Sequence, residues 1–128
     1  MKALLVTQTF LWWNMDDLQL SPAARDFITD RRNELYFSAV CTWEIAIKAS
    51  RGKLVLPEPP EKYVAARLAL HRIHTLPIQP SHTLRVYDLP ELHRDPFDRL
   101  LVVQSQIEGL PILTADENIR RCDVETIW

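Results

Sequence analysis

The chain has 128 residues, of which 47% are hydrophobic and 25% are charged, and its formal net charge is -2 at pH 7. These proportions are ordinary for a globular domain, and the length is sufficient for one hydrophobic core. The slightly negative charge excludes a global basic field, so a nucleic-acid partner would have to be met by a local patch.

Cysteine content and the hydropathy pattern exclude further classes of protein. Cys41 and Cys122 are too few for the disulfide framework of a secreted domain, and they form no Cys-x-x-Cys pair that would indicate zinc. No apolar run approaches the roughly 20 residues of a membrane helix, and no signal-peptide pattern is present. We therefore expect a cytoplasmic protein that does not bind a membrane. Two glycines against nine prolines leave no flexible linker, so residues 1–128 are expected to form a single domain.

Short apolar runs that are typical of buried strands alternate with helical stretches along the chain. The expected strands span residues 3–6, 35–38, 75–77, 111–113 and 124–127. The expected helices span residues 9–13, 22–28, 42–49, 63–71, 81–87 and 96–108, with a rigid proline-rich connection at residues 57–60. This alternation predicts an α/β fold in which helices cover both faces of a parallel sheet.

The segment from His93 to Arg99 contains a strong helix-start pattern. Asp95 is expected to be the N-cap and Pro96 the first helical residue, where its missing N–H costs nothing. Asp98 then falls in the first turn, where the helix dipole favours a negative charge. One interpretation is that these acids only start a helix. The other is that they belong to a site, which requires further carboxylates nearby.

Two further acids, Glu44 and Asp116, could meet Asp98 at one edge of the sheet. Asp116 follows an expected strand directly, and Glu44 lies about two turns into the helix that follows another strand. In open parallel sheets, ligands bind beyond the carboxyl ends of the strands. Clustered carboxylates repel each other unless a cation neutralises them, and Mg²⁺ or Mn²⁺ suits such oxygen ligands. The spacing also allows the alternative that all three acids are solvated surface residues.

Several short sequence motifs follow one another over nearly the whole chain. They are Leu4-Leu5 with Phe10-Leu11-Trp12-Trp13, Ser38-Ala39 with Trp43-Glu44-Ile45-Ala46-Ile47-Lys48, His93 to Arg99, Leu113 to Glu117, and the final Trp128. In content and order these motifs resemble the VapC-type toxins of the PIN-domain family. The resemblance implies an α/β/α sandwich with a central parallel sheet of four or five short strands. It also implies a Mg²⁺-dependent ribonuclease that acts on RNA, pairs with a small cognate antitoxin and forms a homodimer.

The resemblance also implies roles for individual residues. Glu44, Asp98 and Asp116 match the acids that hold the metal ion and perform catalysis. A second tier consists of Asp95, which is better explained by its role as a helix cap, and of two hydroxyl residues, Ser38 and Thr114. These hydroxyls are expected either to orient the carboxylates or to satisfy local backbone groups. The candidates for RNA phosphate contacts are Arg94, Arg99 and Lys48, for which the alternative is a surface charge or a salt bridge.

The sequence departs from the family pattern at the end of the first strand. An aspartate is usual there, in a Leu-Leu-Asp-Thr-His run, whereas this chain has Val6, and Gln8 replaces the histidine. Valine cannot bind a cation, so metal binding and RNA cleavage are expected to be weak or absent while the fold survives. The valine is either a natural divergence or a change selected or introduced because an active toxin harms its host. The alternative function is therefore an inactive binding module that engages an antitoxin or sequesters RNA.

Overall fold

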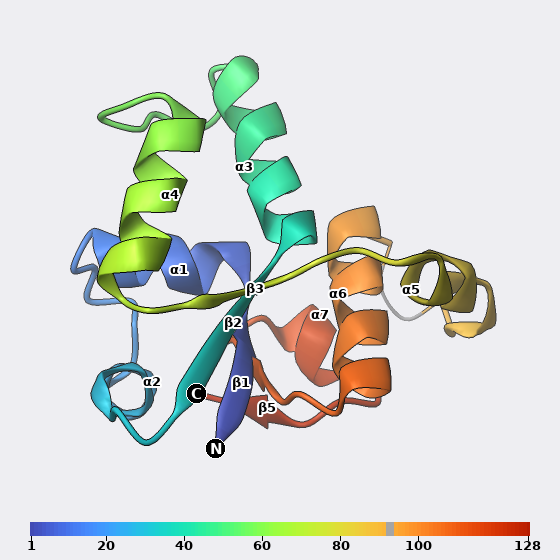
Figure 1. The fold of residues 1–128 in the computed structure, drawn as a ribbon. Coiled ribbons are helices and arrows are strands. Elements are labelled where there is room, and N and C mark those ends of the chain that lie inside the picture. The colour runs from blue at the N-terminus through green and yellow to red at the C-terminus, as the bar shows by residue number, and fades with distance from the viewer. Residues whose placement is uncertain (92–93) are drawn as a thin grey trace.

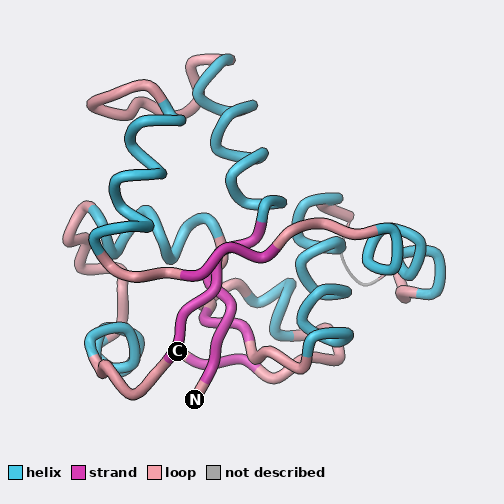
Figure 2. The backbone as a smooth tube through the Cα atoms, in the orientation of Figure 1, coloured by secondary structure: helices cyan, strands magenta, loops and turns pink. Residues whose placement is uncertain are grey.

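The structure is organised around one sheet of short parallel strands. The computed structural model describes residues 1–91 and 94–128, so His93 lies outside the described residues. The strands are β1 (Lys2–Leu5), β2 (Glu34–Ser38), β3 (His74–Leu76), β4 (Ile112–Leu113) and β5 (Thr126–Ile127). They pair in the order β3-β2-β1-β4-β5, and every neighbouring pair is parallel. The expected parallel α/β sheet is confirmed, and its five strands meet in the middle of the molecule (Figure 2).

Helices lie on both sides of this sheet (Figure 1). They are α1 (Thr7–Asn14), α2 (Pro22–Thr29), α3 (Ala39–Ser50), α4 (Pro60–Leu70), α5 (Pro80–Arg85), the 3₁₀ helix η1 (Val86–Asp88), α6 (Pro96–Glu108) and α7 (Glu117–Arg120). In Figure 1, α1, α2 and α4 lie to the left of the strands, and α6 and α7 lie to the right. Within the described part of the chain, no helix combines the length and the apolar character needed to cross a bilayer.

The expected starts of three helices were wrong by two or three residues. Helix α3 begins at Ala39 rather than residue 42, because the hydroxyl of Ser38 caps it by accepting the N–H of Val40. Helix α4 begins at Pro60 rather than residue 63, since a proline is well suited to the first helical position. Helix α1 begins at Thr7, and Val6 is its N-cap residue instead of the last residue of β1.

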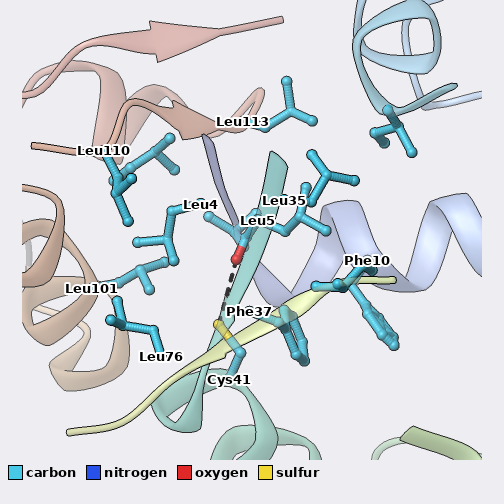
Figure 3. Close-up of a cluster of buried hydrophobic side chains, with 14 of the residues drawn as sticks. Leu4, Leu5, Phe10, Leu35, Phe37, Cys41, Leu76, Leu101, Leu110 and Leu113 are labelled. Carbon is cyan, nitrogen blue, oxygen red and sulfur yellow. Dashed lines mark hydrogen bonds between the residues drawn. The ribbon is translucent and has the colours of Figure 1, made fainter. Parts of the chain in front are cut away.

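The core lies where the central strands meet the helices that cover them (Figure 3). Leu4 and Leu5 of β1 are fully buried, as expected for the middle strand of a parallel sheet. Phe10 of α1 stacks on Phe37 of β2 with ring centroids 4.3 Å apart. The Cys41 thiol lies in the same cluster and points to the carbonyl oxygen of Leu5 at 3.7 Å. These contacts fix α1 and α3 against the sheet, so the residues that follow β1 and β2 are held rigidly.

Helix α6 begins as the sequence predicted. The Asp95 carboxylate accepts the backbone N–H groups of Phe97 and Asp98 at 2.9 and 3.2 Å, and Pro96 is the first helical residue. The helix ends at Gly109, whose φ of 67° lies in the left-handed region that glycine adopts without strain. Asp98 is therefore held in the first turn of α6 by the geometry of the cap.

Loss of the Asp95 cap is expected to destabilise the protein modestly. Asp95→Ala removes the acceptor for two N–H groups and should lower the free energy of unfolding by about 1 kcal/mol. Asp95→Asn keeps an oxygen acceptor and should lose much less than the alanine variant. Urea denaturation of the three proteins checks this, and equal losses in both variants would show that the cap contributes charge rather than hydrogen bonds.

Candidate functional site

A cavity of about 510 Å³ opens at the carboxyl ends of β1 and β4. The sheet order shows why a cavity forms there: the chain runs outward from β1 through β2 to β3, then returns to build β4 and β5 on the other side of β1. Connections that leave neighbouring strands in opposite directions leave a crevice between them, which is where open α/β sheets bind ligands. Val6 and Thr7 come directly after β1 and line this cavity. Thr114 and Asp116 come after β4 and line it as well.

Four carboxylates line this cavity, which we call the acidic pocket. Glu44 comes from α3, Asp95 and Asp98 come from the start of α6, and Asp116 is the N-cap residue of α7. The structure thus brings together the three acids singled out in the sequence, although 72 positions separate Glu44 from Asp116. Carboxylates gathered in one cavity raise each other's proton affinity unless a positive group neutralises them.

Glu44 is the most buried of these acids, with 8% of its surface exposed. Its Oε1 accepts the hydroxyl of Thr7 at 2.7 Å, and its Oε2 lies 2.5 Å from the Nζ of Lys48. The hydrogen bond to Glu44 raises the pKa of Lys48 above its ordinary value, and the charges of Asp95 and Asp98 raise it further. Lys48 therefore remains protonated at neutral pH, and both oxygens of Glu44 have partners from the protein.

Asp116 and Thr114 form a local turn after β4. The Thr114 hydroxyl accepts the backbone N–H of Asp116 at 3.0 Å, and the Asp116 carboxylate accepts the N–H of Asn118 at 2.8 Å. Thr114 thus positions the backbone of Asp116 rather than its carboxylate. The short helix α7, which the sequence did not predict, has Asp116 as its cap.

The Ser38 hydroxyl was expected either to orient the carboxylates or to satisfy local backbone groups. It donates to the side-chain oxygen of Gln104 in α6 and accepts the N–H of Val40, so it takes the local alternative. Ser38 is fully buried at the end of β2, a place from which it fixes the start of α3. It affects Glu44 only through the position of this helix.

The three cations expected to contact phosphate have different surroundings. Lys48 forms the ion pair with Glu44, as the i,i+4 spacing on a helix allows. The Arg99 guanidinium donates to the carbonyl oxygens of Leu89 and Pro90 at 3.1 and 3.0 Å, which ties α6 to the segment before it. Arg94 is exposed. Of the three, only Lys48 lines the acidic pocket.

Thr7, which lines the acidic pocket, is a part of the site that the sequence did not single out. Thr7 could have been found by the same rule that selected Asp116, because it is a polar residue directly after a buried strand. Trp43 packs edge-on against Phe97 with ring centroids 5.2 Å apart. This contact holds α3 against the start of α6, so it fixes the helices on which Glu44 and Asp98 lie.

The buried thiol near the pocket is not a nucleophile at neutral pH. Burial raises the pKa of Cys41 to about 12, and the charges of Glu44 and Asp98 act in the same direction. A thiol with this pKa is protonated at pH 7, and only the thiolate attacks electrophiles. The chemistry of the pocket therefore depends on its carboxylates and lysines.

Comparison with known proteins identifies the family. The sequence matches the PIN domain family over residues 3–125, nearly the whole chain. The chain belongs to the PIN domain family. This confirms the resemblance found in the sequence, and the α/β architecture agrees with it.

The relatives of this PIN domain include proteins of bacterial origin. It is 41% identical over 58 residues to the ribonuclease VapC16 of Mycobacterium tuberculosis, an alignment that spans 45% of this chain and only 40% of that relative. Its fold is similar to VapBC2 from Rickettsia felis, solved bound to a DNA fragment from their promoter, with a TM-score of 0.71, 14% identity and full coverage of both chains. It is also similar to FitAB bound to the IR36 DNA fragment, with a TM-score of 0.59, 15% identity, and coverage of 98% and 93%.

The residues present do not fit a divalent metal ion as they are arranged in this PIN domain. Within residues 1–91 and 94–128, no group of three or more histidine, cysteine or acidic side chains is placed so that it could hold an ion. Val6 contributes no oxygen ligand at the end of β1, and both Glu44 oxygens have protein partners. The Asp95 and Asp116 carboxylates accept backbone N–H groups at helix starts. The pocket has the right residue types for Mg²⁺ but lacks the converging geometry.

Proposed function

We propose that this PIN domain is a VapC-like toxin whose Mg²⁺-dependent cleavage of RNA is impaired, and that it pairs with a small antitoxin. The observation on which the proposal rests is the acidic pocket at the carboxyl ends of β1 and β4, in which Val6 stands beside three acids of the family pattern, Glu44, Asp98 and Asp116. The family, the identity to a ribonuclease, and the likeness in fold to VapBC2 and FitAB support it.

The charge of the pocket explains why cleavage is expected to be weak. Hydrolysis of a phosphodiester needs a water that loses a proton and a positive group that stabilises the charge on phosphorus. Asp98 and Asp116 are bases within the pocket, but their charges repel an RNA phosphate. Lys48 is paired with Glu44, so its charge is largely neutralised before any phosphate arrives. When bound, a divalent ion would supply both the activated water and the missing positive charge.

A second candidate function is binding without cleavage. Two features, Val6 in the pocket and the Glu44–Lys48 ion pair, favour a chain that has the PIN fold but does not cleave RNA. Such a chain would engage an antitoxin or sequester RNA, in the cytoplasm and as a homodimer. Trp12 lines the pocket and packs near Trp128 with ring centroids 5.9 Å apart, so quenching of tryptophan fluorescence would report a partner that covers this rim.

The test incubates the purified chain with RNA in Mg²⁺, in Mn²⁺ and in EDTA, with Val6→Asp as the positive control. We expect cleavage by Val6→Asp in Mg²⁺ that EDTA and Asp98→Asn both remove, little or no cleavage by the parent chain, and no growth arrest when the parent chain is expressed. Cleavage that persists in EDTA would contradict the proposal, since it would not depend on a metal. A parent and a control that are both inactive, together with binding of RNA or of a co-purified small protein, would favour the second candidate.

A further inference from the structure

We propose that Lys48 takes the place of a divalent cation in the acidic pocket, so that this chain is neutralised from within and does not recruit Mg²⁺ or Mn²⁺. The inference deepens the proposed function, since it concerns the same pocket and gives a second cause for weak cleavage besides Val6. The proposed function concerns RNA cleavage, whereas this inference concerns ion binding by the folded chain, which can be measured without RNA.

Lys48 and Glu44 are in direct contact. Both residues lie on α3, one helical turn apart, and the ammonium nitrogen is 2.5 Å from Oε2 of Glu44. The Glu44 side chain is 11% exposed and the Lys48 side chain is 46% exposed, so water screens this contact from the lysine side only. A metal ion would have to displace the ammonium group from Glu44 or share the carboxylate with it at a distance where two cations repel.

The other oxygen of Glu44 is occupied as well. Oε1 accepts the hydroxyl of Thr7, the first residue of α1, at 2.7 Å. The two contacts together fix the carboxylate between α1 and α3. Each oxygen of Glu44 therefore already has one partner supplied by the protein.

Lys48 also faces the remaining acids of the pocket. The charges of Asp95 and Asp98 act on its ammonium group in addition to that of Glu44. With Val6 in place of a further carboxylate, four acids and two lysines, Lys48 and Lys53, line the cavity. With one fewer acid and with the ammonium group of Lys48, the pocket attracts a divalent ion less strongly. The carboxylates also repel each other less, so they need such an ion less.

Lys53 provides a matched control for Lys48. It lines the same cavity, but in the described part of the chain no ion pair joins its ammonium group to an acid. Lys48→Met and Lys53→Met each remove one positive charge from the pocket and keep a long apolar stem. Only Lys48→Met removes the cation that is paired with the Glu44 carboxylate.

The experiment measures Mn²⁺ binding by calorimetry and by thermal unfolding, with the full chain in EDTA as the metal-free reference. The parent and Lys53→Met should show no heat of binding and no change in Tm on adding Mn²⁺. Lys48→Met should have a lower Tm than the parent in EDTA and should recover at least about 5 °C in saturating Mn²⁺. It should also bind Mn²⁺ at least about tenfold more tightly than the parent.

Two results would overturn the inference: Mn²⁺ binding by the parent as tight as that of Lys48→Met, or equal behaviour of Lys48→Met and Lys53→Met. If Lys48→Met does not fold, Lys48→Gln keeps a hydrogen-bond donor for Glu44 without the charge and should gain Mn²⁺ binding in the same way. The proposed function fails separately, because it depends on RNA cleavage by Val6→Asp. A repaired chain that cleaves RNA while Lys48→Met gains no Mn²⁺ would reject only the role of Lys48.

Discussion

Val6→Asp is expected to raise the rate of Mg²⁺-dependent RNA cleavage by at least about 100-fold and to make expression of the chain toxic. Val6 is 7% exposed and enters the acidic pocket directly after β1. A carboxylate at this place would face the cavity that Asp98 and Asp116 line, and would add the charge that the pocket lacks for holding a divalent ion. The gain is read from the initial rate of cleavage in Mg²⁺ and from growth after induction.

The same substitution should cost little stability, because Val6 is the N-cap residue of α1 and its side chain cannot accept a hydrogen bond there. Aspartate and asparagine are favoured N-caps that stabilise a helix start by about 1 kcal/mol relative to apolar residues. This gain offsets part of the cost of placing another negative charge in an acidic cavity. The folded state of Val6→Asp should therefore persist without metal, as circular dichroism in EDTA would show.

Val6→Asn is the matched control for this prediction. It supplies the same cap to α1 without a charge, so it should be at least as stable as Val6→Asp and gain no cleavage. Glu44→Gln, Asp98→Asn and Asp116→Asn, each added to Val6→Asp, should remove the gain. If the parent and Val6→Asp cleave equally, the acid at the end of β1 is dispensable. Activity that survives each of the three amide substitutions would refute the assignment of those acids.

Much of the fold was predictable because its strands and helix starts are local features of the sequence. The buried run around Leu4 and Leu5 indicated a central strand, and the Asp95-Pro96 pair indicated the start of α6. The presence of Glu44 and Asp116 in one cavity was predictable from a rule of topology, since the carboxyl ends of parallel strands share one edge. The apolar pattern extended β1 to Val6, which instead is the N-cap residue of α1.

The details that the sequence could not give are contacts between side chains far apart in the chain. Ser38 and Gln104 are separated by 66 positions, so their hydrogen bond could not be read from spacing, and the role of Ser38 stayed open between the carboxylates and local backbone groups. Lys48 was a candidate for a phosphate contact, with a surface charge or a salt bridge as the alternative, and its i,i+4 spacing from Glu44 already allowed the ion pair. Burial decided between these two roles, and burial depends on the tertiary structure.

The second large effect is expected at Gln104, a fully buried side chain in α6 that joins the elements beneath the pocket. Its oxygen accepts the Ser38 hydroxyl, and its nitrogen contacts the carbonyl oxygen of Pro77 and Nδ1 of His82, at 3.2 and 3.3 Å. Gln104→Ala should lower the free energy of unfolding by about 3 kcal/mol, because it leaves a cavity and removes partners from buried polar groups. Gln106→Ala, on the exposed side of the same helix, should lose less than about 1 kcal/mol.

Gln104→Met separates the two causes of this loss, since it fills the cavity but leaves the polar groups of Ser38 and His82 without that partner. Its free energy of unfolding, measured by urea denaturation, should lie between those of the alanine variant and the parent. Because Ser38 caps α3, amide hydrogen exchange in the first turn of that helix should also become faster in both Gln104 variants. Equal losses at Gln104 and Gln106 would show that the buried contacts do not hold α3, the helix on which Glu44 and Lys48 lie.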